Sequence, residues 1–170
     1  MKNLILILLM AFSLQINAQV AKCKNAIVVL SSAGNGSITA TGINNGSIGY
    51  VSLSVSPSVF NCSSVGQNVV TLTATAADGN TSTCTGMVIV KDLTKPLAKC
   101  KNATVLINAD LTLSYQVIDN GSTDACGILS YTLTPSFFSC VNGVHNVTLS
   151  VKDVNNNQSS CTGVVTIVCN

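Results

Sequence analysis

Cysteine and aspartate are the residue types in this chain that could do chemistry. The 170 residues contain eight Cys, six acids that are all Asp, a single His and no Trp. Thiols can pair, attack an electrophile or bind a metal, and clustered carboxylates can bind Ca²⁺ or transfer protons. The spacing of these residues favours one of these chemistries only when the two copies of an internal repeat are compared.

The sequence contains two copies of one pattern. Three segments recur: AKCKNA at 21–26 and 98–103, NGS at 45–47 and 120–122, and CTG at 84–86 and 161–163. Self-similarity at a spacing of 75 to 77 residues predicts two tandem domains of the same fold.

The chain also has the organisation of an exported protein. Residues 1–18 have a lysine near the start, a short apolar run and a small residue at the end, which is typical of a cleaved signal peptide. We therefore expect domains at 19–92 and 93–170, called module 1 and module 2 below. A secreted, extracellular protein associated with the cell surface is expected, with no membrane insertion after cleavage.

Short alternating runs predict strands. They occur at 51–55 and 70–74 in module 1 and at 131–133 and 147–151 in module 2. Turn signals rich in Gly and Asn separate them, at 33–36, 44–46 and 78–80 in module 1. Six or seven short strands per module predict an all-β fold, two immunoglobulin-like antiparallel β-sandwiches in tandem.

The cysteines match between the copies with one exception. Cys23, Cys62 and Cys84 correspond to Cys100, Cys140 and Cys161, whereas Cys126 falls in a segment that module 1 lacks. The simplest pairing is Cys23–Cys84 and Cys100–Cys161, with Cys126–Cys140 as a small loop in module 2. Such bridges would help modules this small to stay folded.

This pairing leaves Cys62 and Cys169 over. They could be a buried free thiol and a frayed terminal residue, or they could form an intermolecular disulfide that joins molecules head to tail into a fibre. Other pairings, including Cys62–Cys169 within one chain, remain open.

Three carboxylates of module 2 have no acidic counterpart in module 1. Asp119 corresponds to Asn44, Asp153 corresponds to Ala76, and Asp124 lies in the missing segment. In an immunoglobulin-like sandwich these residues would share a pole that faces the linker and Asp92. Clustered oxygens of this kind suit a calcium site. The alternative is that each carboxylate caps its own loop as an Asx turn, with no cofactor.

Other chemistry is not supported. His145 has no partner at metal spacing, no catalytic motif occurs, and we expect a protein that is not an enzyme. The mature chain has seven Lys and six Asp, hence a net charge of about +1. Nucleic acid needs a dense basic surface, so it is not expected as a partner.

The pattern resembles the hyalin repeat (HYR-like), in the four-cysteine version found on surface proteins of gliding and adherent bacteria. The resemblance covers nearly the whole mature chain. It rests on CSSVG at 62–66, the strand 70–74, DGN at 78–80, Cys84 and the strand 88–90. Two departures are the missing second cysteine of module 1 and Ala76 in place of an Asp.

The resemblance implies cell-surface adhesion or a structural spacer, without catalytic residues. Partners would be a cell-surface or matrix protein or glycan, or copies of the same chain. The alternative function is a subunit of an extracellular filament, polymerising head to tail through strand edges or through a Cys62–Cys169 intermolecular disulfide.

Overall fold

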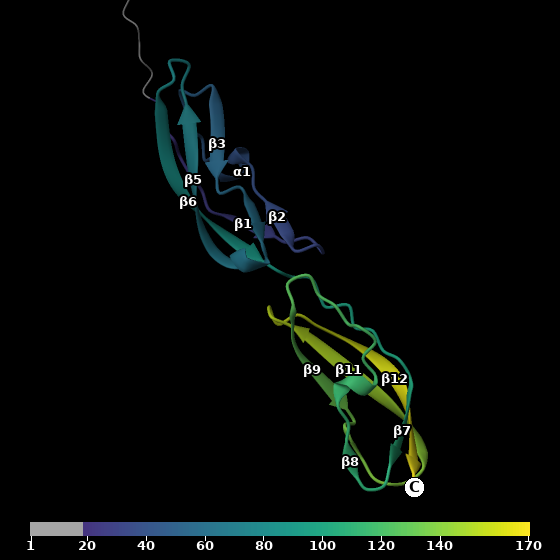
Figure 1. The fold of residues 1–170 in the computed structure, drawn as a ribbon. Coiled ribbons are helices and arrows are strands. Elements are labelled where there is room, and N and C mark those ends of the chain that lie inside the picture. Colours follow the sequence, from purple (N-terminus) through teal and green to yellow (C-terminus); the bar gives the residue numbers. More distant parts are fainter. Residues whose placement is uncertain (1–18) are drawn as a thin grey trace, which may run out of the picture.

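The structure is a computed structural model that describes residues 19–170, so the expected signal peptide at 1–18 lies outside the described residues. The described chain is all-β and forms two halves that lie end to end (Figure 1). No helix within residues 19–170 is long and apolar enough to cross a membrane.

Module 1 contains six strands, a short helix and one 3₁₀ turn. Its elements are β1 (Ala26–Val29), β2 (Asn35–Ser37), α1 (Ala40–Ile43), β3 (Ser52–Ser56), β4 (Val59–Asn61), η1 (Cys62–Ser64), β5 (Gly66–Thr75) and β6 (Thr81–Lys91). The expected alternating strands are confirmed as β3 and β5, and Gly46 and Gly79 adopt positive φ in the expected turns. The helix α1, a single turn capped by Thr39, was not expected.

Module 2 repeats the order of the strands, with a 3₁₀ turn in the place of α1 and no counterpart of η1. Its elements are β7 (Ala103–Ile107), β8 (Leu111–Thr112), η2 (Tyr115–Val117), β9 (Ile128–Thr134), β10 (Phe137–Phe138), β11 (Gly143–Asp153) and β12 (Gln158–Cys169). Six strands in each half agree with the sequence-based expectation.

Each half is a two-sheet sandwich of immunoglobulin type. A four-stranded sheet in the order β1-β6-β5-β3 faces the pair β2-β4, and β7-β12-β11-β9 and β10-β8 are their counterparts. Most pairs are antiparallel, but the first and last strands of each module, β1 with β6 and β7 with β12, run parallel.

The two halves have separate cores. Val70, Leu72 and Val88 are fully buried in module 1, and Val147, Leu149 and Val165 are their counterparts in module 2. These side chains come from alternate positions of β5, β6, β11 and β12, as the period of two in a half-buried strand requires. Each module therefore carries its own hydrophobic stabilisation.

The repeated CTG segment has a packing reason. A Cβ placed on Gly86 would lie 2.7 Å from the backbone oxygen of Lys24, and one on Gly163 would lie 2.5 Å from that of Lys101. The last strand thus passes directly over the chain beside the first cysteine of its module. Only glycine permits this approach. The approach brings the cysteine of the same CTG segment, Cys84 or Cys161, within bonding distance of its partner.

Candidate functional site

The long intramodule disulfides form as expected. Cys23 bonds to Cys84 and Cys100 bonds to Cys161, each across 61 residues. Each bridge ties the chain just before the first strand to the last strand of the same module.

The expected Cys126–Cys140 bridge is wrong. Cys126 bonds to Cys62 of module 1, and Cys140 bonds to Cys169. The strand β9 runs between Cys126 and Cys140 and spans seven residues, so the two lie at opposite poles of module 2. At about 3.3 Å per residue that separation is roughly 20 Å, whereas disulfide Cα atoms lie about 4.4–6.8 Å apart.

The expected surplus of Cys62 and Cys169 is wrong for the same reason. Both residues are bonded within the chain, and no cysteine among residues 19–170 is free. Neither a free thiol at Cys62 nor an intermolecular Cys62–Cys169 bond agrees with these pairings. The prediction of a filament joined by Cys62–Cys169 disulfides is therefore wrong.

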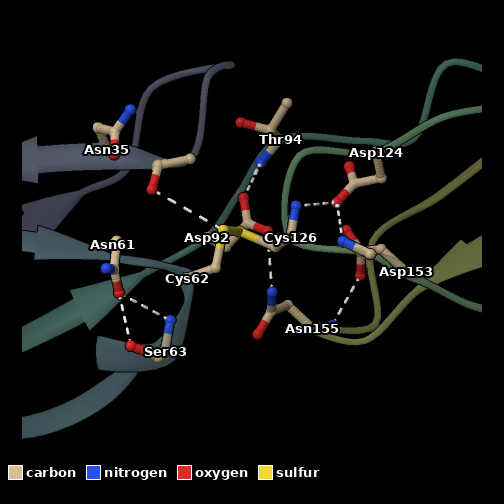
Figure 2. The surroundings of a disulfide bond; sticks show 12 residues. Asn35, Asn61, Cys62, Ser63, Asp92, Thr94, Asp124, Cys126, Asp153 and Asn155 are labelled. Atoms are coloured by element: carbon tan, nitrogen blue, oxygen red, sulfur yellow. Dashed lines mark hydrogen bonds between the residues drawn. A yellow bond between two sulfur atoms is a disulfide. The ribbon is translucent and has the colours of Figure 1, made fainter.

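The Cys62–Cys126 bridge joins the two modules, and Figure 2 shows its surroundings. Cys62 opens η1 at the end of module 1 that faces module 2, and Asn61 caps this turn by accepting from the Ser63 N–H at 3.0 Å. Cys126 packs against the core cluster of module 1. Gly34 comes so close that an added Cβ would lie 2.7 Å from the Cys62 sulfur.

Asp92 is a second tie between the modules. One carboxylate oxygen accepts from the Thr94 N–H at 3.0 Å, and the other accepts from the Asn155 side-chain amide at 2.8 Å. The Asn157 amide also donates to the Asp92 backbone oxygen at 3.2 Å. Asp92 is buried, so these bonds are shielded from water and hold the β11–β12 hairpin against the end of β6.

Asp153 and Asp124 cap loops on the module 2 side of the junction. Asp153 is completely buried and accepts from the Asn155 and Asn157 N–H groups and from the Asn157 amide, at 2.7 to 2.9 Å. Asp124 accepts from the Cys126 and Gly127 N–H groups at 2.8 and 3.1 Å. This second set of bonds presents Cys126 towards Cys62.

Asp119 has a separate role. Its carboxylate accepts from the Ser122 N–H at 3.1 Å and from the Ser122 hydroxyl at 2.6 Å. In module 1, Asn44 accepts from the Ser47 N–H at 2.9 Å in the same way. The position requires an acceptor oxygen rather than a charge, as the Asx-turn alternative predicted.

The expected calcium ligands are thus brought together only in part. Ligand atoms of Asp92, Asp124 and Cys126 lie within 4.8 Å of one another, but the Cys126 sulfur is bonded in the disulfide. Calcium takes six to eight oxygens, and the carboxylates here already accept N–H groups of their own loops. The arrangement fits loop capping better than ion binding.

Sequence reasoning missed Asn155 and Asn157, which complete the junction. Their signal was the change from Ala-Asp-Gly-Asn at 77–80 in module 1 to Val-Asn-Asn-Asn at 154–157 in module 2. Asp78 corresponds to Asn155, so an exposed carboxylate is replaced by an amide that can donate to Asp92. The sequence would have revealed this donor only to a reader who also considered that module 2 follows Asp92 at the end of module 1.

Cavities in the described chain are shallow. A crevice of about 450 Å³ between the modules is lined by residues that include Ser32, Leu97, Thr123 and Asp124. A second hollow of about 250 Å³ lies at the far end of module 2, where His145 meets Phe138 edge-on at 5.2 Å. The His145 side chain forms no hydrogen bond to a nucleophile within residues 19–170, so no catalytic pair is assembled around it.

Comparisons with known proteins find similar folds but no family. No family model and no curated protein matches the sequence. The fibronectin(III)-like modules of Clostridium thermocellum CbhA match at 15% identity over 88% of this chain and 91% of theirs, with a TM-score of 0.33. Human mucin-like protocadherin EC1-2 matches at 13% identity over 90% of this chain and all of that one, with a TM-score of 0.42.

Proposed function

We propose that this chain is a secreted, non-enzymatic protein of the cell surface that acts as a rigid spacer or adhesion element. The observation that carries the proposal is the Cys62–Cys126 disulfide, which joins two complete sandwiches end to end. This bond adds Cys126 to the edge of the module 1 core and also restrains the relative orientation of the two modules, which a bond within one module does not do.

Four disulfides support an extracellular location. Bonds of this kind persist in oxidising compartments and are rare in the reducing cytosol. The expected signal peptide at 1–18 agrees with export, and the hyalin-repeat resemblance agrees with a place on the cell surface. We also assign the chain to that repeat type as part of the proposal, because the Cys23–Cys84 bridge links the first and last cysteines of the pattern.

Three contacts support rigidity. The disulfide and the Asp92–Asn155 bond cross the junction, and the Ser159 hydroxyl donates to the Pro96 backbone oxygen at 2.6 Å, which holds the linker against module 2. Pro96 further restricts the linker by its fixed φ. A chain that is restrained at several points transmits force between the modules and holds them at a fixed distance. A flexible linker does neither.

A ligand would then be a cell-surface or matrix protein or glycan, held at a set distance by the rod. The non-enzymatic part of the proposal rests on the sequence, which contains no catalytic motif. Nucleic acid is not part of the proposal, because the mature chain is almost neutral and nucleic acid needs a dense basic surface.

The experiment that tests the proposal measures the distance distribution between the modules. Spin labels on exposed strand positions of each module, read by pulsed electron resonance, should give one narrow distribution for residues 19–170. The double variant Cys62→Ser with Cys126→Ser should broaden it while each module stays folded.

A matched control is the double variant Cys140→Ser with Cys169→Ser, which also removes one disulfide but leaves the junction intact. This control should keep the narrow distribution. Equal breadth for the intact chain and the junction variant would refute the rigid-spacer proposal.

A further inference from the structure

The contact between the two modules indicates which surfaces at the two ends of the described chain are suited to bind each other. At the junction, the far pole of module 1 meets the near pole of module 2 through Cys62 and Cys126. Within residues 19–170, the same two kinds of pole occur once more, at the opposite ends of the described chain (Figure 1). We call them the near pole of module 1 (Val20, Ile48, Tyr50 and Val51) and the far pole of module 2 (Phe137, Val141 and His145).

The near pole of module 1 has its counterpart inside the junction. Val20 pairs with Ile48 in an isolated bridge, and Leu97 pairs with Thr123 in the equivalent bridge of module 2. Leu97 and Thr123 line the crevice that faces module 1. Val20 and Ile48 therefore occupy positions that, in module 2, face another module.

The far pole of module 2 is related to the junction in the same way. Cys140 corresponds to Cys62, so Val141 corresponds to Ser63 and Phe137 corresponds to Val59. Cys140 bonds to Cys169 within its own module and makes no link outward. This pole has neither the η1 turn nor the covalent contact of the module 1 pole.

At each end, one apolar residue stands where the junction counterpart is polar. Ile48 stands where Thr123 stands, and Val141 stands where Ser63 stands. These side chains are exposed, Ile48 by 55%, Val141 by 67% and Phe137 by 59%. Phe137, Val141 and His145 also line the hollow of about 250 Å³. Exposed apolar side chains gathered around a hollow mark an interaction site more often than a solvated surface.

We propose that the far pole of module 2 binds the near pole of module 1 of a second copy of this chain, so that the rods associate head to tail. The contact pairs the same two kinds of pole as the internal junction, with apolar side chains in place of the disulfide and of the Asp92–Asn155 bond. Because the two surfaces differ, the contact is heterologous and can propagate. This inference goes beyond the proposed spacer function and uses no free cysteine.

The contact should be weak. The ends of such narrow modules offer less than the roughly 800 Å² per partner of a standard interface. We expect a dissociation constant on the order of 0.1 mM, so that association matters where copies are concentrated, as on a surface.

Sedimentation velocity on residues 19–170 over a concentration series tests the inference. Wild type should form a concentration-dependent series of dimers and longer species. The far-pole variant Phe137→Val with Val141→Ser and the near-pole variant Ile48→Thr should each weaken association about tenfold or more. Each substitution places the residue of the sister module at the same position, so folding should be preserved, and circular dichroism checks it.

A mixture of the two variants separates head-to-tail from symmetric contacts. The far-pole variant keeps an intact near pole and the near-pole variant keeps an intact far pole. The mixture should therefore form one-to-one dimers with the wild-type affinity and nothing longer. Val69→Ser, on an exposed strand position away from both ends, is the matched control and should associate like wild type.

Three results would overturn the inference. They are a wild-type chain that stays monomeric to about ten times the expected dissociation constant, pole variants that associate as the wild type does, and a mixture that fails to form dimers. A symmetric contact through one pole would instead leave one of the two variants associating as the wild type does, both alone and in the mixture.

Discussion

Cys62 and Cys140 occupy the same position in two copies of one fold, yet they do different work. Cys62 reaches across to Cys126 of the neighbouring module, whereas Cys140 bonds to Cys169 at the end of its own last strand. The residue that decides between them lies on the last strand or just after it: module 1 has Asp92 where module 2 has Cys169. The repeated cysteine therefore closes its own module or joins two modules, depending on whether its module has Cys169 or Asp92 at the equivalent position.

The same exchange alters the surroundings of the junction. Asp92 cannot close the pole of module 1 covalently, but it accepts the Asn155 amide from module 2 at 2.8 Å. Module 1 is therefore connected at its far pole by a disulfide and a buried hydrogen bond, and module 2 closes the equivalent pole on itself. The predictions below test how far the two modules are otherwise equivalent.

The largest effect should come from the long disulfides. Cys23→Ser with Cys84→Ser, or Cys100→Ser with Cys161→Ser, releases a loop of 61 residues in each case. The chain-entropy model gives about 4 kcal/mol for either pair, and equal losses would show that the modules are equivalent in this respect. Hydrogen exchange read by mass spectrometry measures the loss separately in each module. A loss confined to about 1 kcal/mol would contradict this account.

Removing Asp153 should cost slightly less. Asp153→Ala removes the acceptor of two part-buried N–H groups and one of the two acceptors of the Asn157 amide, and we expect a loss of about 3 kcal/mol in module 2. Module 1 supplies the comparison, because Ala76 occupies this position and the exposed Asp78 caps the hairpin through the Asn80 N–H instead. Asp78→Ala should therefore cost about 1 kcal/mol or less. Chemical denaturation followed by tyrosine fluorescence measures both.

Calcium removal distinguishes capping from ion binding at the same residues. If Asp92, Asp124 and Asp153 act through their N–H partners, a chelator should leave the melting temperature of the wild type unchanged. A drop that matches the effect of Asp153→Ala would instead support the calcium site that the clustered carboxylates suggested from the sequence.

The sequence was sufficient for the features that each module builds alone. Alternation at 70–74 and 147–151 predicted the central strands, and the repeated CTG predicted two equivalent bridges, because all of these depend on contacts within one copy. It was not sufficient for Cys62, because its partner Cys126 lies in a segment that module 1 lacks, and the simplest pairing placed Cys126 with Cys140. The role of Asp119 could have been predicted, since Asn44 in the equivalent position already pointed to an acceptor without charge.

The glycine of the CTG segment should give an intermediate effect. Gly163→Ala places a Cβ about 2.5 Å from the Lys101 backbone oxygen, and Gly86→Ala places one 2.7 Å from that of Lys24. We expect a loss of about 2 kcal/mol for each, because backbone cannot move aside cheaply. Thr162→Ala, exposed on the same strand, should change stability by less than about 0.5 kcal/mol and is the control for the substitution itself. Thermal denaturation is the measurement.

The smallest effect should appear at alkaline pH and only in module 2. Tyr131 stacks on Tyr115 with ring centroids 4.2 Å apart, whereas module 1 has Leu53 at the equivalent position. Burial raises the pKa of Tyr131 above its usual value of about 10, and the charge of Asp119 and the neighbouring Tyr115 add to the shift. The folded state therefore keeps a proton that the unfolded state loses. The stabilisation is complete below pH 10 and is lost as the pH rises through the higher folded pKa.

Hydrogen exchange between pH 9 and 12, corrected for its intrinsic pH dependence, should thus show an extra loss of protection in module 2 that module 1 lacks. Tyr131→Phe should remove this loss. Asp119→Asn should reduce it in part, because it removes the charge but keeps the acceptor that Asn44 supplies in module 1. The same alkaline loss in both modules, or its persistence in Tyr131→Phe, would show that the difference between the modules does not extend to this pair of rings.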